Sequence, residues 1–202
     1  ARDHPDLAPE RSRSLELSVD LHPTDRFTAT LSVFRHDLDN LIVSLPAVSR
    51  PGQLDLYGYA NVATAVSQGF EARVVGAPHR RLKLDASYGF TDSRDGETHE
   101  KIAGRATHQL TAQVSWRPPF GLDLSVRGMV LGPRPFEVDL DRDGAFERVD
   151  SDWHALFDAR AAYDLTPNLR AFGGIDNVFG TGDPDIFPIR PRNFYLGLSG
   201  RY

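Results

Sequence analysis

The sequence predicts an all-β protein: an antiparallel, up-and-down wall of about nine strands that forms part of a transmembrane β-barrel. Three observations predict this fold. Apolar and polar residues alternate through much of the 202-residue chain, the connections between the alternating stretches are short and long by turns, and aromatic residues stand at the ends of the stretches.

Two-residue alternation marks nine stretches of the chain. In the last of them, Phe194, Leu196 and Leu198 share one side, and Tyr195 and Ser199 share the other. Successive side chains of a strand point to opposite faces, so each stretch predicts a strand with one apolar and one polar face. The nine stretches are residues 15–21, 27–33, 69–74, 82–90, 108–116, 122–130, 153–165, 169–178 and 193–202. Helical periodicity is absent, so we expect essentially no helix.

The connections between these stretches are of two kinds that alternate along the chain. The short ones are rich in turn formers: HPTD (22–25), APHRR (77–81), RPPFG (117–121) and LTPN (165–168). The long ones are polar and lie at about residues 46–56, 92–103, 133–151 and 179–191. In an up-and-down sheet, this order places all short turns at one end and all long loops at the other, as in outer-membrane barrels. The stretches are also close to the ~9–11 residues that a strand needs to cross a bilayer.

In such a barrel, the apolar face of each strand contacts lipid and the polar face lines a wet lumen, which is consistent with the mean hydropathy of −0.38. We expect these charged residues to face the lumen and form cross-strand pairs: Glu16, Asp20, Glu71, Arg73, Asp123, Arg127, Asp158 and Arg160. The aromatic residues expected at the membrane interfaces are Phe27, Phe90, Trp116, Phe120, Trp153, Tyr163 and Tyr202. A soluble β-sandwich or lipocalin-type barrel remains an alternative, because its strands also have one apolar face.

Composition excludes several classes of protein. The net charge of −5 is the opposite of the basic footprint of a nucleic-acid-binding protein, so no nucleic-acid partner is expected. The chain has no cysteine, which excludes disulfides, thiolate zinc sites and cysteine nucleophiles. No apolar run approaches the ~18–20 residues of a membrane helix, and we expect no signal peptide in the opening residues.

The segment DLDRDGAFERVD (139–150) has the spacing of an EF-hand-type calcium loop. The expected Ca²⁺ ligands are Asp139, Asp141, Asp143, the carbonyl of Ala145, and Asp150. Gly144 stands where such a loop turns sharply. The final carboxylate is an Asp rather than the longer Glu, and no helices flank the loop. The segment therefore has two interpretations, a weak calcium site on a β scaffold or a solvated external loop, and no other cofactor is expected.

Aromatic and arginine side chains in or beside the long loops are candidates for ligand binding: Tyr57, Tyr59, Arg134, Phe136, Phe187, Arg190 and Arg192. Such side chains suit an anionic ferric chelate or a planar ligand, and the alternative is that they anchor strand ends at the interface. The seven histidines are scattered, with no metal-binding spacing on one strand. No nucleophile elbow, phosphate-binding loop or credible triad is present, so the sequence predicts no enzyme. A membrane hydrolase remains an alternative, because His, Ser and Asp do occur in the wall.

Several segments resemble a known family, the TonB-dependent outer-membrane receptors for ferric siderophores, cobalamin and related scarce nutrients. The segment YANVATAVSQGFEARV (59–74) resembles a family motif through its Tyr, Asn, Ala, Gly and Glu. The segment DARAAYDLTPNLRAFGGIDNVFGT (158–181) resembles another through Asp176, Asn177 and Phe179, with Gly180 in place of the usual acidic residue. Further similar segments are SRSLELSVDLHP (12–23), LSVFRHDLDNLIV (31–43), GRATHQL (104–110, with Ala106 where Pro is commoner) and the ending PRNFYLGLSGRY (191–202).

The resemblance implies that residues 1–202 are the C-terminal part of a receptor barrel in the outer membrane of a Gram-negative bacterium. The implied partners are outer-membrane lipid, the plug domain and remaining strands of the same protein, the TonB complex through the N-terminal part, and the barrel-assembly machinery through the C-terminal strand. Nine strands is an odd number, and such transporters have ~22, so we expect only part of a barrel. A passive porin-like or adhesion barrel remains the alternative function.

Overall fold

The computed structural model describes residues 7–48, 56–139, 143–182 and 189–200. Within these ranges no residue is helical, and no helix is a candidate for spanning a membrane. The described strands of the main sheet are β1 (Arg11–Thr24), β2 (Phe27–Val48), β3 (Leu56–His79), β4 (Leu82–Asp95), β5 (His108–Trp116), β6 (Leu122–Leu131), β9 (His154–Thr166), β10 (Leu169–Asp176) and β11 (Asn193–Gly200). A separate two-stranded sheet holds β7 (Pro135–Val138) and β8 (Glu147–Asp150).

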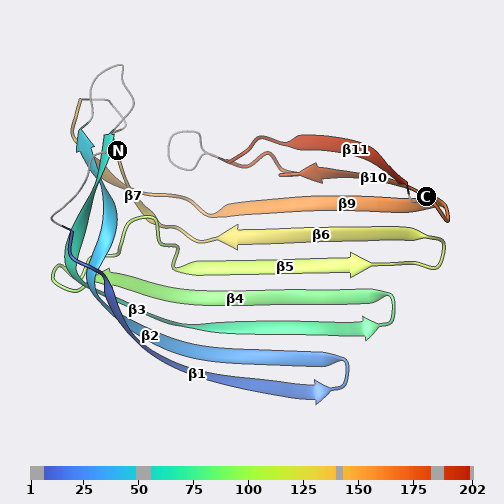
Figure 1. Cartoon of the computed structure of the whole chain (residues 1–202), viewed down its shortest axis with the longest axis horizontal. Helices are drawn as coiled ribbons and strands as arrows, with labels where there is room; N and C mark the ends of the chain where they lie inside the picture. The colour runs from blue at the N-terminus through green and yellow to red at the C-terminus, as the bar shows by residue number, and fades with distance from the viewer. Residues whose placement is uncertain (1–6, 49–55, 140–142, 183–188, 201–202) are drawn as a thin grey trace.

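The main sheet has nine strands in the order β1-β2-β3-β4-β5-β6-β9-β10-β11, and each strand is antiparallel to its neighbours. The short turns β1–β2, β3–β4, β5–β6 and β9–β10 lie together at one end, on the right of Figure 1, and the longer connections lie at the other. The sheet is an open, curved wall, because β1 and β11 do not pair with each other. The predicted all-β, up-and-down partial barrel is confirmed.

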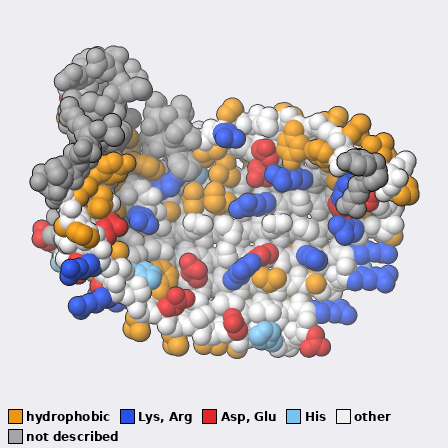
Figure 2. All heavy atoms as spheres, viewed as in Figure 1, with side chains coloured by type: hydrophobic (Ala, Val, Ile, Leu, Met, Phe, Trp, Pro, Cys, Tyr) orange, Lys and Arg blue, Asp and Glu red, His pale blue; other side chains and the backbone are white. Residues whose placement is uncertain are grey.

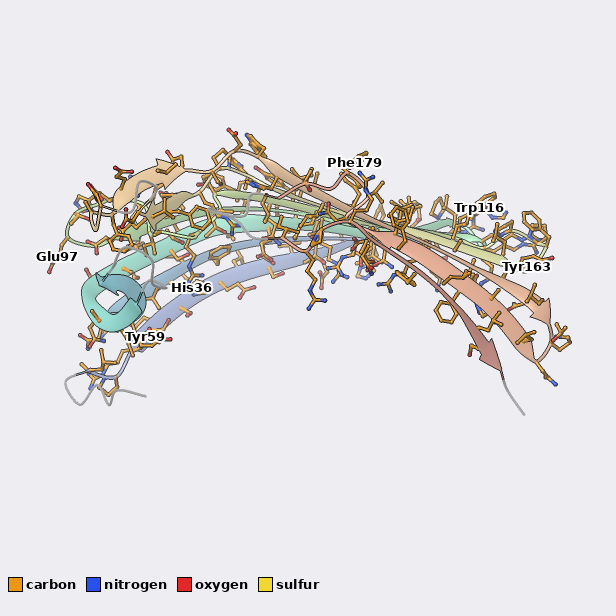
Figure 3. All side chains as sticks on the ribbon, turned by 90° about the horizontal axis from the view of Figure 1, so that it is seen from above. His36, Tyr59, Glu97, Trp116, Tyr163 and Phe179 are labelled. Atoms are coloured by element: carbon orange, nitrogen blue, oxygen red, sulfur yellow. The ribbon has the colours of Figure 1, made fainter. Side chains whose placement is uncertain are left out.

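The sheet is a single layer, and its convex face is apolar. Figure 3 shows the wall edge-on, with Trp116 and Phe179 on the convex side. The strand registers align the predicted apolar residues in rows across this face, such as Leu17, Val33, Phe70 and Phe90. Among the described residues, Ala65 and Leu131 are the only buried hydrophobic side chains apart from prolines such as Pro135. Leu17 is 66% exposed, so the apolar face has no second layer of protein over it.

Two strands are much longer than the alternation predicts. β2 has 22 residues and β3 has 24, and they pair with each other up to Val48 and Leu56. The predicted loop 46–56 is correspondingly shorter. Alternation marks a strand only where apolar and polar residues take turns. The extension contains consecutive apolar residues, such as Leu41, Ile42 and Val43, so it lacks the two-residue period.

The β7–β8 hairpin lies inside the predicted loop 133–151, and the sequence did not predict it. Each of its strands has four residues, which is too short for a two-residue period to be recognised. The hairpin begins after Arg134, whose backbone carbonyl accepts from the Ser151 amide at 2.9 Å. The predicted loop is therefore a folded element on the long-loop end of the wall.

Candidate functional site

The concave face of the wall is polar and charged, and Figure 2 shows it from the side that a barrel would enclose. Hydrogen bonds join neighbouring strands along it. Thr30 donates to Asp20 at 2.7 Å, and the hydroxyls of Ser87 and Thr111 lie 2.6 Å apart. Each is a directly opposed cross-strand pair, which is the unit that stabilises a sheet.

Charges predicted for the lumen lie on this face, and some of them form ion pairs. Arg73 forms an ion pair with Asp85 at 2.6 Å. Asp123 accepts from both Arg117 and Arg170. Arg117 lies in a short turn, where alternation carries no information about side-chain direction, so the sequence could not identify this pair.

A hollow of about 710 Å³ opens on the outer half of the concave face, and we call it the outer hollow. Its charged lining comes from β6, β9, β10 and the segment before β11: Arg127, Asp158, Asp176, Arg190 and Arg192. Cations and carboxylates thus converge with the apolar side chains of Met129, Leu156 and Ile189. Such a mixture can bind a ligand that carries both charge and apolar surface.

Asn177 is part of the lining of the outer hollow. It is 5% exposed and has a φ of 51°, a left-handed value that Asn tolerates better than most residues. Its side-chain amide donates to the carbonyls of Thr181 at 2.7 Å and Arg190 at 3.0 Å. Its backbone amide donates to Asp158 at 2.9 Å. The family-like motif at 176–179 therefore ends β10 and fixes the backbone of Arg190 beside the hollow.

Arg134 and Phe136 lie together at the base of the β7–β8 hairpin. The Arg134 guanidinium carbon lies 5.0 Å from the centre of the Phe136 ring, which is a cation–π contact. Burial lowers the pKa of Arg134 from its ordinary value, although a guanidinium stays charged at physiological pH. The structure brings these two predicted ligand-binding residues together, and their contact also stabilises the hairpin.

The other predicted ligand-binding residues lie apart from this pair. Tyr59 is on β3, 57% exposed, at the long-loop end of the wall, opposite the end that holds Trp116 (Figure 3). Tyr57 is also on β3, but its side chain falls outside the described part of the structure, and Phe187 lies outside the described residues altogether. Arg190 and Arg192 share the outer hollow. The predicted residues thus form at least three separate groups.

The carboxylates of the predicted calcium loop support its turn. Asp139 accepts from the backbone amides of Asp143 at 3.1 Å and Gly144 at 3.0 Å. The Asp143 carboxylate accepts from the Ala145 amide at 2.7 Å, and Asp150 lies in β8 opposite Pro135. Asp141 lies outside the described residues. No group of three or more acidic or histidine side chains suited to a metal occurs among the residues that the structure describes, and the calcium site stays a prediction.

An aromatic cluster on the convex face includes a residue that the sequence left unassigned. The rings of Phe70, Tyr88, Phe90, His108 and Trp153 form a chain of contacts with centroids 5.3–6.2 Å apart. The Tyr88 hydroxyl and the His108 Nδ1 lie 2.8 Å apart. Phe90 and Trp153 were predicted at this interface, and His108 joins them. In the sequence, His108 stands on the apolar side of its strand with Leu110 and Ala112, and this position could have indicated its place on the convex face.

Residues 2–178 match the family described as TonB dependent receptor-like, beta-barrel. The chain belongs to the TonB-dependent receptor family. This family consists of transport receptors in the outer membrane of Gram-negative bacteria, and the resemblance inferred from the sequence is confirmed.

Solved structures of such receptors have the same fold. The ferripyoverdine receptor of Pseudomonas aeruginosa is 19% identical, with a TM-score of 0.74, and the match covers 96% of this chain and 27% of that one. The ferric enterobactin receptor PfeA of Pseudomonas aeruginosa is 23% identical, with a TM-score of 0.70 and coverages of 95% and 31%. The copper transporter OprC is 15% identical, with a TM-score of 0.71 and coverages of 97% and 32%. The chain thus spans about a third or less of these receptors.

Proposed function

We propose that this chain is the C-terminal part of the barrel of an outer-membrane receptor that takes up a ferric siderophore or a similar scarce nutrient, energised through TonB. The family match over residues 2–178 carries this proposal. The similarity to receptors for two ferric siderophores supports an iron chelate as the cargo. The similarity to a copper transporter shows that the fold alone does not select the cargo.

In this proposal each face of the wall has its own role. The convex face contacts lipid, and the barrel-assembly machinery recognises the last strand. The concave face lines the lumen, contacts a plug domain from the N-terminal part of the protein, and presents the outer hollow to the incoming ligand. Arg190 and Arg192 attract an anionic chelate there, while Tyr59, Arg134 and Phe136 act at the external rim. Calcium bound by residues 139–150 would order the hairpin.

The rival function is a passive porin-like or adhesion barrel without TonB coupling. Uptake of a radioactive ferric siderophore by cells that express the full-length receptor separates the two. We expect uptake to stop when TonB is deleted, and equal uptake with and without TonB would establish the passive alternative. Siderophores of several chemical classes should be compared, because the cargo class is part of the proposal.

Arg190 tests the role of the outer hollow. We expect Arg190→Glu to weaken binding of the anionic chelate about tenfold, since it replaces an attractive charge with a repulsive one. Arg13→Glu is the matched control, because Arg13 lies on the convex side in register with Asp37. Equal binding by the two variants in a fluorescence titration would remove the outer hollow from the ligand path.

A further inference from the structure

Three hollows adjoin on the concave face, along β6 and β9. The outer hollow shares Arg127 and Asp158 with a middle hollow of about 130 Å³. The middle hollow shares Ser125 and Arg160 with an inner hollow of about 640 Å³ at the short-turn end. The three therefore form one continuous groove along the axis of the wall, from the long-loop end to the short-turn end.

Positive charge predominates along this groove. Cations outnumber carboxylates in each of the three hollows, and the inner hollow has six cations and one carboxylate. That carboxylate, Asp123, already accepts from Arg117 and Arg170. Among the described residues, no ion pair joins Arg127 or Arg160 to a carboxylate. The groove thus holds positive charge that is not neutralised, which attracts an anion.

Other hollows of the concave face are balanced in charge. The hollow over β3, β4 and β5 has two cations and two carboxylates in its lining, and its Arg73 pairs with Asp85 at 2.6 Å. A hollow beside the β1–β2 turn also has two cations and two carboxylates. The excess of cations therefore distinguishes the groove from these two hollows. Figure 2 shows blue side chains from the middle of the concave face to the short-turn end, on the right.

Three arginines follow one another down the groove, and we call them the arginine track: Arg127 on β6, Arg160 on β9 and Arg170 on β10. The strand registers place them level with positions 158, 160 and 164 of β9. At ~3.3 Å per residue, the track covers about 20 Å of the wall. The Arg160 guanidinium also lies 5.9 Å from the centre of the Tyr195 ring. A cation beside an aromatic ring suits an anion that also carries planar groups.

We propose that the arginine track is the route by which an anionic chelate crosses the lumen, from the outer hollow to the inner hollow. This inference rests on the proposed function, in which the ligand enters at the long-loop end. The guanidinium groups donate to carboxylate or catecholate oxygens at successive levels, so the anion exchanges one charged contact for the next. The arginines of the track are thus positioning residues that select a negatively charged cargo.

Arg160→Gln tests the track, because Arg160 lies at its middle level and is exposed. In cells that express the full-length receptor, we expect radioactive iron on an anionic catecholate or citrate chelate to enter about tenfold more slowly, since one charge-assisted contact is lost. Binding at the cell surface, measured without TonB, should stay unchanged. Arg160→Lys keeps the charge and should restore most of the uptake. Arg73→Gln is the matched control, because it removes the same charge from the same face outside the groove.

Uptake is divided by the amount of folded receptor, which the heat-dependent shift in gel mobility measures. Unchanged uptake in Arg160→Gln, or equal slowing by Arg73→Gln, would overturn the route. So would equal slowing of a neutral hydroxamate chelate, or a receptor that transports only neutral chelates. In each of these outcomes, uptake that still requires TonB leaves the proposed function standing, whereas uptake without TonB would remove it.

Discussion

Asn177 shows how one buried side chain holds an external connection. Its amide satisfies the carbonyls of Thr181 and Arg190, and the Thr181 amide donates back to its oxygen at 3.0 Å. The Thr181 hydroxyl continues this network to the Ala155 carbonyl on β9 at 2.7 Å. The network therefore ties the segment after β10 to the wall.

We expect Asn177→Ala to loosen this segment at a cost of about 1 kcal/mol, because the partly buried carbonyls of Thr181 and Arg190 lose their donor. Hydrogen exchange at the amides of Val178 and Thr181 should accelerate, while exchange in β5 stays unchanged. Asn177→Gly separates the loss of the hydrogen bonds from backbone strain, because glycine accepts the positive φ without strain but also lacks the side chain. If both variants protect these amides as well as the wild type does, the network does not hold the segment.

Asp95 gives the β4–β5 connection a dependence on pH. Its carboxylate accepts from the amides of Thr98 and Glu97, both at 2.8 Å, and these bonds lower the pKa of Asp95 from its ordinary value. A carboxyl whose pKa is lowered by folding contributes stability above its unfolded pKa of ~3.9, and this is lost as the pH falls through the folded pKa. The turn should therefore loosen only below about pH 4.

Amide chemical shifts of Glu97 and Thr98 measure this titration. We expect both to change together, with a midpoint below 3.9. Asp95→Asn keeps an accepting oxygen but removes the charge, so its shifts should lack that transition. A midpoint above 3.9 in the wild type would show that the carboxylate is not stabilised by the two amides.

At the scale of the strands, Gly69 is required by a close approach within the sheet. A Cβ at this position would lie within van der Waals overlap of the Phe90 carbonyl oxygen, which is backbone and cannot rotate away. Gly89, on the adjacent strand, has only the Glu71 Cγ at 3.8 Å from the same hypothetical atom. The two glycines therefore form a matched pair of positions at which the effect of an added Cβ can be compared.

We expect Gly69→Ala to destabilise the barrel by about 1–3 kcal/mol or more, because overpacking forces the backbone of β3 and β4 apart. Gly89→Ala should be nearly neutral. The shift in gel mobility on heating, which distinguishes folded from unfolded barrels, gives the fraction folded at each temperature. Equal melting of the two variants would contradict the close approach.

Arg148 links two external elements. Its guanidinium donates to the Glu100 carboxylate at 2.9 Å and to the Lys101 carbonyl at 2.6 Å, which joins the β7–β8 hairpin to the β4–β5 connection. The ion pair is exposed, and such pairs contribute about 0–1 kcal/mol. Arg148→Ala should therefore leave barrel melting unchanged but make the hairpin more sensitive to protease. Unchanged cleavage of the hairpin would show that the link does not hold it.

The sequence predicts the lipid-facing part of this wall well and its external part poorly. Alternation identifies β5, β6 and β9 to within one residue of their ends, because one face of each contacts an apolar environment, and it identifies β4 except for its last five residues. The same signal vanishes in the outer parts of β2 and β3, where apolar residues follow one another without alternation, as in Leu41, Ile42 and Val43. Side-chain partners such as Arg170 and Asp123 come from strands that are distant in sequence, so no local pattern could pair them.

At the scale of the whole molecule, charge is distributed along the axis of the wall. The outer hollow combines cations with carboxylates. The inner hollow, at the short-turn end of the concave face, is lined by six cations and one carboxylate: Arg80, Arg81, Lys83, Arg117, Arg160 and Arg170, with Asp123. The external connections also carry many acidic residues, including Asp95, Glu97 and Glu100. An anionic ligand is therefore attracted more strongly to the short-turn end than to the external end.

The central claim is that the convex face contacts lipid and the concave face contacts water. Residues 1–202 contain no cysteine, so single labels can be placed along β5 at Ala112, Gln113, Val114 and Ser115, after replacement of any cysteine elsewhere in the full-length receptor. In a bilayer, spin labels at 112 and 114 should be more accessible to oxygen, and those at 113 and 115 to a water-soluble nickel complex. Equal accessibility at all four positions, or the reverse alternation, would contradict the account.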